Sequence, residues 1–531
     1  MVFWFGVPMW RRATRRQLIA AASAIGGGSA VGLAAVKLLG GESVTPAALR
    51  SEAAATSVPP SSRLVPPSSE MRPRTLAQEA TGDPAADVFQ LPAGMAVVTS
   101  PRLPLFDIGS GQLGPVLGGA ITDWVEVGCP LSLTVVPVSL AGSEVPGVAA
   151  TETVADYAAL LELLVSSDGV GGLALIPVDQ VDFRVNVLAV DGFDPVRSNS
   201  DARVARIGVV GDIVPGRNVE AKMRTYGDYT HPFQRVAAEL SGYDLTIANL
   251  EGNLSANLPV PTDPTTFTFL ADPAMIDGFK LAGIDAVTLA NNHSTWNTEG
   301  WGTQGLTDTI DALAAAGLPH FGAGKDQTEA RAPFTTEIAG YSVAILGIDG
   351  VTANLQARDA GATVDRTELG NELYAGATDD APGTSPYDPD IFLVDIAALA
   401  ERYDIVIPYI HGGVEYVEVP PQWLVDDCHA AIDAGASLVV TNHPHVIQGM
   451  EVYAGRPIVY SVGNFIFDQM FSVQTRQGLI LELVMRGDRC VQLRTRGVEI
   501  EDFNQPRLMT AGEQAAIMDR FWASTDRIAD G

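Results

Sequence analysis

The sequence contains few cysteines, few histidines and few basic residues. Its 531 residues include three cysteines, seven histidines, and 33 Lys and Arg against 63 Asp and Glu. Three cysteines are too few for a disulfide framework, and at most one bridge could form. The formal net charge of −30 disfavours nonspecific nucleic-acid binding, which depends on Lys and Arg neutralising phosphates. We therefore expect no nucleic-acid partner.

Length and composition indicate a globular protein of several domains. A chain of 531 residues is too long for one ordinary hydrophobic core, so two or more domains are expected. Its 47% hydrophobic and 18% charged residues are ordinary for globular protein. The acidity does not exclude an anionic substrate, because bound metal ions can reverse the sign of the local charge.

Residues 1–41 contain a basic segment followed by an apolar stretch rich in Gly and Ala. The run "TRRQLI" resembles the twin-arginine export signal, which a receptor reads. The alternative is a plain membrane anchor with a basic flank. Both interpretations predict an exported protein, in the cell envelope or outside the cell, either free or anchored to the cytoplasmic membrane.

Two further segments precede the main pattern. Residues 42–84 are rich in Ala, Pro and Ser without an apolar period, which predicts a flexible linker. Residues 85–198 contain strands and the helical run "TVADYAALLELLVSS", which predicts a small α/β module. Parts of this module resemble one lobe of a periplasmic solute-binding domain of the phosphate or molybdate type. The alternative is a structural spacer, and we expect the boundary near "RSNSDAR".

From residue 204 onward, apolar strands alternate with amphipathic helices. The expected strands are "ARIGVVG", "DLTIANL", "IDAVTLA", "YSVAILGI", "DIVIPYI" and "ASLVVT". Continuous apolar strands with helical crossovers predict sheets covered by helices. The later runs "RPIVYSVGN", "GLILELVM" and "CVQLRTRGVEI" have no helices between them and are predicted to be antiparallel additions. We assign 204–505 to this domain and 506–531 to a tail or helix.

Polar side chains follow five of these strands. They are Asp212, Asn249, Glu251, Asn291, Asn292, His293, His411, Glu415, His443 and His445. Since the carboxyl ends of strands in an open α/β sheet define the ligand crevice, these groups should converge. Carboxylate, amide oxygen and imidazole together suit Mn, Fe, Co or Zn. One catalytic zinc takes fewer protein ligands, so the pattern predicts two divalent ions sharing a bridging carboxylate.

Several motifs in this region resemble the CapA family of capsule and poly-γ-glutamate synthesis proteins. They lie between about residues 204 and 468 and read "GDIVPGR", "NLEGNL", "LANNHSTWNTEGWGTQGLTDTIDAL", "GAGKDQTEAR", "HGGVEY" and "TNHPHVIQGMEVYAGRPIVYSVGNFIFD". The resemblance implies a calcineurin-like metallophosphoesterase fold, a sandwich of mixed sheets flanked by helices. It places the metal ligands at Asp212, Glu251, Asn292, His411, His443 and His445. It places His293 at the position of a general acid or transition-state stabiliser.

The sequence departs from the wider phosphoesterase pattern at one position. There a His follows the first Asp by two residues, whereas this chain has Val214. Beyond the metal ligands, Arg217, Asn249 and Glu415 are candidates for contacting substrate.

The resemblance implies a role in synthesis, processing or export of an anionic cell-surface polymer of the poly-γ-glutamate type. A hydrolase acting on a phosphoester or an amide is one interpretation, supported by His293. The alternative is a non-catalytic accessory protein that grips polymer carboxylates through the metal site, which Val214 favours. A membrane-bound polymer synthase or export complex is the expected protein partner.

Overall fold

The computed structural model describes residues 89–143, 145–198, 203–296, 301–351 and 375–530. These ranges fall within one compact unit, Val88–Gly531. The expected export signal or anchor and the linker lie outside the described residues. Within the described ranges, no helix is both long enough and apolar enough to cross a membrane.

The N-terminal module is built on a five-stranded sheet with the order β4-β3-β5-β1-β6. Its strands are β1 (Met95–Thr99), β3 (Val136–Leu140), β4 (Glu152–Val154), β5 (Gly172–Pro177) and β6 (Asn186–Val187), and its helices are α3 (Ser110–Leu117) and α4 (Tyr157–Val165). Helix α4 begins where the Asp156 carboxylate accepts a hydrogen bond from Ala159 N at 3.0 Å. The helix packs Leu160, Leu161 and Leu164 onto the sheet.

Two larger sheets form the rest of the structure. An eight-stranded sheet has the order β13-β12-β9-β8-β23-β24-β25, with β22 also paired to β8. It comprises β8 (Ala205–Ile213), β9 (Leu245–Leu250), β12 (Ala286–Thr288), β13 (His320–Phe321), β22 (Asn464–Ile466), β23 (Gln477–Arg486), β24 (Arg489–Glu501) and β25 (Gln505–Leu508). A six-stranded sheet has the order β15-β16-β18-β19-β21-β20. It comprises β15 (Phe334–Ile338), β16 (Tyr341–Asp349), β18 (Ile405–His411), β19 (Val439–Asn442), β20 (Met450–Tyr453) and β21 (Arg456–Val459).

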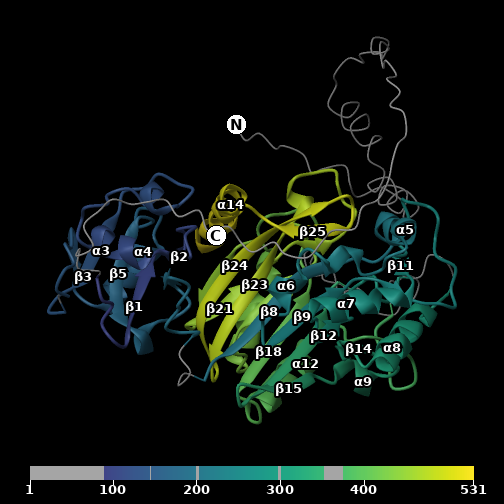
Figure 1. The fold of residues 1–531 in the computed structure, drawn as a ribbon. Helices are drawn as coiled ribbons and strands as arrows, with labels where there is room; N and C mark the ends of the chain where they lie inside the picture. The colour runs from purple at the N-terminus through teal and green to yellow at the C-terminus, as the bar shows by residue number, and fades with distance from the viewer. Residues whose placement is uncertain (1–88, 144, 199–202, 297–300, 352–374, 531) are drawn as a thin grey trace, which may run out of the picture. The chain divides into compact units, whose positions relative to one another are not determined.

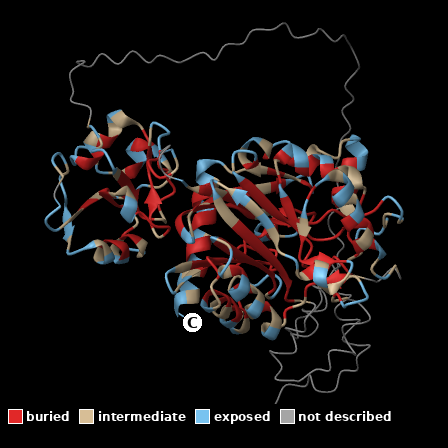
Figure 2. Ribbon diagram, turned by 90° about the horizontal axis from the view of Figure 1, so that it is seen from below, coloured by how far each residue is buried: buried red, intermediate tan, exposed pale blue. Residues whose placement is uncertain are grey.

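The two sheets face each other, with helices on their outer faces (Figure 1). The helices over the eight-stranded sheet include α5 (Arg217–Tyr226), α6 (Ala237–Leu240), α7 (Ile276–Ala282) and α8 (Gln304–Ala316), and those over the other sheet include α12 (Pro389–Ala400) and α13 (Gln422–Asp433). In strand β18, alternate side chains point to opposite faces of the sheet. Ile405, Ile407 and Tyr409 enter the core between the sheets, whereas Val406 and Ile410 pack beneath the helices. Buried residues accordingly run along the strands of both sheets (Figure 2).

The prediction of mixed α/β structure with sheets flanked by helices is confirmed. Strands β23 and β24 are antiparallel, as expected for the later runs. For "RPIVYSVGN" the prediction holds only in part, because β21 runs antiparallel to β20 but parallel to β19. The connection through β20 reverses the chain before β21, so a parallel partner is reached without a crossover helix.

The last helix, α14 (Ala511–Asp530), completes the core. Ile517 and Phe521 pack among the side chains between the two sheets. Gln514 fixes the helix to β24, because its side-chain oxygen accepts a hydrogen bond from Gly497 N at 2.7 Å. The residues after 505 are therefore part of the packed structure.

Contacts cross the expected boundary between the N-terminal module and the rest of the chain. Val484 and Val491 of the eight-stranded sheet pack into the core of the module. The fully buried Asp194 carboxylate accepts hydrogen bonds from Arg197 Nε at 3.0 Å, Gln492 Nε2 at 3.0 Å and Arg494 Nη2 at 2.9 Å. The module is therefore joined to the sheet through a buried ionic network as well as apolar contacts.

We predict that Asp194→Ala lowers the free energy of unfolding by about 3–5 kcal/mol, because it leaves buried guanidinium groups without their carboxylate. Chemical denaturation of the full chain measures the change. The control is Asp311→Ala, which removes an exposed ion pair with Lys325 and should cost at most about 1 kcal/mol. Equal losses in the two variants would contradict a buried network at the junction.

Candidate metal centre

Six predicted ligands come together at the carboxyl ends of strands from both sheets. Asp212 lies near the end of β8, and Glu251 follows β9. His411 ends β18, in the same alternating row as Ile405, Ile407 and Tyr409, so its ring enters the space between the sheets. Asn292, His443 and His445 follow β12 and β19 and are also buried.

These side chains form two groups of possible ligands that share one carboxylate. Glu251, His411 and His443 form one group, and Asp212, Glu251 and His445 form the other. The ligand atoms within each group lie within 4.8 Å of one another. Glu251 Oε1 is 3.6 Å from His411 Nε2 and 3.9 Å from His445 Nε2. This placement suits a carboxylate that bridges two ions.

The carboxylates lack the partners that buried charges require. Among the described residues, Asp212 Oδ2 and both carboxylate oxygens of Glu251 are buried without a hydrogen bond. Burial, and then the neighbouring Asp212, raise the pKa of Glu251 well above its usual value. Burial lowers the pKa of His445, but Glu251 and Asp212 outweigh burial and raise it to about 10. The site thus favours positive charge, and its donors fit divalent transition metals.

The loop after β19 holds its two histidines in strained backbone conformations. His443 has a φ of 116° and His445 a φ of 57°, a region that residues other than glycine seldom occupy. The fold holds this geometry through contacts on both sides of the loop: Asn442 accepts a hydrogen bond from Val462 N, and Pro444 accepts one from Tyr416 N. Such strain is expected where surrounding contacts hold a functional geometry.

Asn292 and His293 project from a loop that Asn291 braces. Asn291 Oδ1 accepts hydrogen bonds from the backbone N–H groups of His293 at 3.1 Å and Ser294 at 2.9 Å. The loop brings Asn292 Oδ1 to 2.8 Å from His411 Nε2, beside the group of ligands around Glu251. Asn291 therefore supports the loop that carries Asn292 and His293.

His293 faces the ligands through one ring nitrogen. Its Nδ1 lies 3.0 Å from the carbonyl oxygen of Phe267, and its Nε2 lies 3.8 Å from Glu251 Oε1. The ring packs against Phe269 and stacks on Trp296, with centroid separations of 4.4 and 5.5 Å. Burial, followed by the charge of His445, keeps the pKa of His293 well below its usual value. The ring stands beside the ligand cluster, with its orientation fixed by the carbonyl and the aromatic rings.

The three predicted substrate-contacting residues differ in how far they are buried. Asn249 is fully buried, and its amide donates a hydrogen bond to Asp212 Oδ1 at 2.7 Å. It therefore fixes the orientation of the Asp212 carboxylate. Arg217 pairs with Asp468 and lies over the rings of Phe269 and Phe467, at 5.0 and 5.1 Å. Glu415 is exposed, close enough to act electrostatically on the buried ligands. Of the three, Glu415 and Arg217 remain candidates for meeting a substrate.

At the position where the superfamily has a His, Val214 is fully buried with Phe269 and Phe467 in a small apolar cluster. Its side chain therefore has an apolar packing role, and its backbone N–H donates to Ile466 O at 2.8 Å. Any further ligand for the Asp212 group must come from elsewhere.

Sequence reasoning missed Asn464 and Tyr409. Asn464 Oδ1 lies 2.9 Å from His445 Nδ1, and its amide nitrogen donates to Thr475 O at 2.9 Å, which fixes the orientation of the amide. The close approach of β22 to β8 that places Asn464 there depends on Gly211, whose Cβ would lie 1.9 Å from Gly463 O. The quoted motif "VGNFIFD" already contained Asn464.

Tyr409 lies two residues before His411 in the same row. Its hydroxyl is buried and has no hydrogen-bond partner among the described residues. Burial, and then the charges of Asp212 and Glu251, raise the pKa of Tyr409 well above its usual value. The alternation of β18 would have pointed to this side chain once His411 was chosen as a ligand.

We predict that chelation destabilises the protein, because it leaves the carboxylates of Asp212 and Glu251 buried without a cation. In chelator, Glu251→Gln should be more stable than the unsubstituted chain by about 1–3 kcal/mol, since the buried Glu251 must take up a proton to become neutral and a glutamine is already neutral. Denaturant unfolding and elemental analysis measure both effects. Glu415→Gln is the control, because that carboxylate is exposed. A chelated chain as stable as the metal-loaded chain would rule out this account of the site.

A second prediction concerns Asn464. Asn464→Ala should weaken metal affinity about 10–100-fold by releasing His445 from its hydrogen bond. A competition titration with a chromogenic chelator measures the affinity. Gln492→Ala removes a buried amide at the junction with the N-terminal module and should leave metal affinity unchanged. If both variants bind metal like the parent chain, Asn464 does not position His445.

Residues 206–469 match the family model described as "Bacterial capsule synthesis protein PGA_cap". The chain is 29% identical over 299 residues to "Capsule biosynthesis protein CapA" of Bacillus anthracis, a match that covers 55% of this chain and 66% of that protein. It is 28% identical over 307 residues to "PGA biosynthesis protein CapA" of Bacillus subtilis (strain 168), covering 58% and 74%. The chain thus spans just under two thirds of the first relative.

Among solved structures, TT1561 of Thermus thermophilus aligns with a TM-score of 0.29 at 13% identity, covering 55% of this chain and 98% of that one. The assignment to a family rests on the sequence matches. They confirm the resemblance drawn from the motifs, and every predicted metal ligand lies inside the matched segment. Residues 206–469 are thus a domain of the bacterial capsule synthesis protein PGA_cap family.

Proposed function

We propose that this chain acts outside the cytoplasmic membrane in the synthesis or processing of an anionic cell-surface polymer of the poly-γ-glutamate type. The names of the two Bacillus relatives support the polymer, and the segment at residues 1–41 supports export. We further propose that it hydrolyses a phosphoester or amide bond. The observation that carries this proposal is the shared, buried Glu251 between two groups of histidine ligands.

Two divalent ions, of the Mn, Fe, Zn or Co type, would polarise the bond to be cleaved and lower the pKa of water. The ligands for one would be Glu251, His411, His443 and Asn292, and those for the other Asp212, Glu251 and His445. Because all six are buried at strand ends, the protein supplies a fixed arrangement that does not reorganise during the reaction.

His293 is placed to transfer a proton beside this cluster. The contact of Nδ1 with the Phe267 carbonyl leaves Nε2 directed to the side where Glu251 lies. Because Nδ1–H donates to the carbonyl of Phe267 in the neutral ring, Nε2 would first take up a proton from the attacking water. It would then pass that proton to the leaving group of the bound substrate. Arg217 would attract the negative charge of the substrate, and Asp468 fixes the direction of its guanidinium.

An accessory role without catalysis is the second candidate. The apolar packing of Val214 favours it, because the Asp212 group then has one protein ligand fewer than the superfamily pattern. In this role the ions would bind polymer carboxylates directly, and a membrane-bound synthase or export complex would be the partner.

We predict that His293→Ala lowers hydrolysis by about 10²–10⁴-fold while keeping its metal, because a general acid contributes that much to rate. Phosphodiesters and γ-glutamyl peptides assayed with Mn provide the rate, and elemental analysis provides the metal content. Asn292→Ala is the matched comparison, since it removes a ligand from the adjacent position and should lose metal as well as rate.

Val214→His tests the alternative. A rise in the rate of hydrolysis would show that the native site is catalytic and that it binds the metal ion of the Asp212 group weakly. If His293→Ala changes neither hydrolysis nor polymer binding, while Asn292→Ala abolishes polymer binding, the accessory role is correct and the catalytic proposal is wrong.

A further inference from the structure

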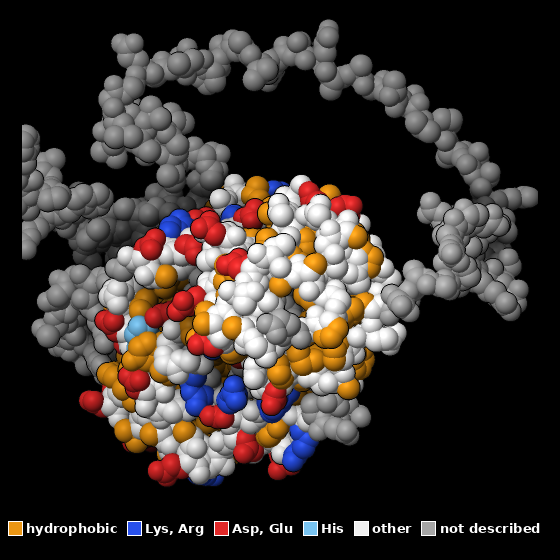
Figure 3. All heavy atoms as spheres, turned by 90° about the vertical axis from the view of Figure 1, so that its left-hand side faces the viewer, with side chains coloured by type: hydrophobic (Ala, Val, Ile, Leu, Met, Phe, Trp, Pro, Cys, Tyr) orange, Lys and Arg blue, Asp and Glu red, His pale blue; other side chains and the backbone are white. Residues whose placement is uncertain are grey.

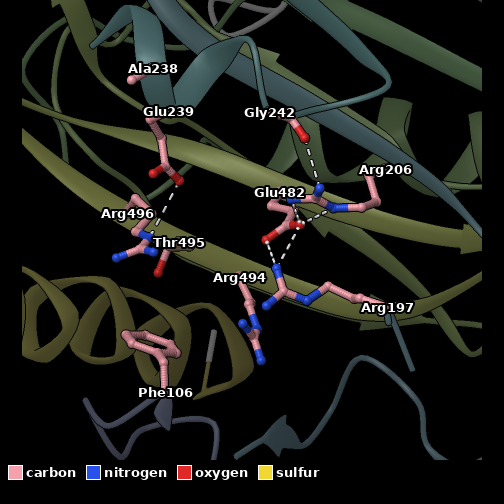
Figure 4. Close-up of a pocket in the computed structure, with 10 residues that line it drawn as sticks. All are labelled: Phe106, Arg197, Arg206, Ala238, Glu239, Gly242, Glu482, Arg494, Thr495 and Arg496. Atoms are coloured by element: carbon pink, nitrogen blue, oxygen red, sulfur yellow. Dashed lines mark hydrogen bonds and ion pairs between the residues drawn. The ribbon is translucent and has the colours of Figure 1, made fainter. Parts of the chain in front are cut away.

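A second polar pocket lies at the other end of β8 from the metal centre. Arg206 and Asp212 are six positions apart on this strand, which corresponds to roughly 20 Å. The pocket has a volume of about 230 Å³ and lies where the N-terminal module meets the eight-stranded sheet. Four arginines line it: Arg197, Arg206, Arg494 and Arg496 (Figure 4).

Two buried carboxylates hold three of these guanidinium groups. Glu482 pairs with Arg197 at 3.1 Å and with Arg206 at 2.8 Å. Asp194 pairs with Arg197 at 3.0 Å and with Arg494 at 2.9 Å. Burial acts to raise the pKa of Glu482, but the arginines outweigh it and keep the pKa below its usual value. Positive charge therefore dominates the surroundings of this carboxylate.

The fourth arginine is held more loosely. Arg496 Nε lies 3.5 Å from Glu239, and that carboxylate also accepts a hydrogen bond from Tyr243 at 2.9 Å. The side chain of Arg496 is 53% exposed, so its guanidinium can move toward a ligand. Counting every carboxylate that contacts these side chains, four guanidinium groups face three carboxylates.

Arg494 carries the clearest sign of a missing partner. Its side chain is only 11% exposed, and among the described residues its Nε is buried without a hydrogen-bond partner. Its Nη2 donates to Val187 O at 2.7 Å and to Asp194. Burial, and then the neighbouring charge of Arg197, lower the pKa of Arg494 to about 10. Such a group would be stabilised by an anion.

This concentration of positive charge is unusual for a chain with a net charge of −30. On the face drawn in Figure 3, acidic side chains are spread widely, and Lys and Arg side chains lie among them in several places. An ion-pair network that served only to join the module to the sheet would need no surplus of guanidinium groups and no pocket between them.

We propose that this pocket binds an oxyanion, either a phosphate or a carboxylate, between Arg494 and Arg496. Its volume lies below the roughly 300–1,000 Å³ of pockets for drug-sized ligands, so it suits a small anion or one end group of a longer molecule. Guanidinium groups match both kinds of oxyanion through paired hydrogen bonds. The proposal does not depend on hydrolysis at the metal centre.

The test is calorimetric titration of the full chain in chelator, which removes anion binding to metal ions. Inorganic phosphate and a γ-glutamyl tripeptide are the two probes. At least one should bind with one site per chain, and Arg496→Gln should weaken that binding about tenfold through loss of a charge-assisted hydrogen bond. Arg235→Gln, which removes an exposed arginine paired with Glu501 elsewhere on the surface, should leave the affinity unchanged.

Arg494→Lys provides a second variant that keeps the buried charge, and it should also weaken binding. Binding of phosphate alone would identify a phosphate or phosphoester ligand, and binding of the peptide alone would identify a carboxylate; both outcomes support the proposal. The proposal is overturned if neither probe binds, or if Arg496→Gln and Arg494→Lys bind as tightly as Arg235→Gln. The arginines would then serve only to join the module to the sheet.

Discussion

The structure depends most on two buried carboxylates, three of whose four oxygens have no hydrogen bond among the described residues. Asp212 lies on β8 and Glu251 directly follows the adjacent strand β9, so the two carboxylates lie close together. Placing like charges together in a protein interior costs several kcal/mol unless a cation compensates them. Both sheets, the strained loop of His443 and His445, and the amides of Asn249 and Asn464 are arranged around that charge. The stability of the fold and the occupancy of the metal centre therefore depend on each other.

Much of this arrangement could be predicted because it follows from local pattern. Strands buried on both faces read as continuous apolar runs, and all six expected strands of the main domain are present. Each polar ligand lies at the end of such a run, so the topology of parallel strands brings the ligands together. His411 could be placed most firmly, since it continues the alternation of Ile405, Ile407 and Tyr409 toward the space between the sheets.

What the sequence could not supply was pairing between distant segments. β21 becomes parallel to β19 only because β20 reverses the chain first, and no periodicity in "RPIVYSVGN" encodes that partner. Asn464 reaches His445 because Gly211 and Gly463 allow two backbones to touch. Asp194 likewise gathers Gln492 and Arg494 from a strand nearly 300 positions away. Such contacts depend on tertiary packing, which local sequence does not determine.

The same strand, β8, connects the two charged regions of the molecule. Its carboxyl end carries Asp212, in a negatively charged site that favours metal binding. Its amino end carries Arg206, one of the arginines that line the pocket. Ile207 and Val209 lie between Arg206 and Asp212 on this strand and face the apolar core. The metal centre and the arginine pocket are therefore separated by a layer of side chains that excludes water. A long anionic molecule that reached both ends would have to pass over the surface. A small anion at the arginines would instead act only on the junction with the N-terminal module, by neutralising the surplus charge that Glu482 and Asp194 leave uncompensated.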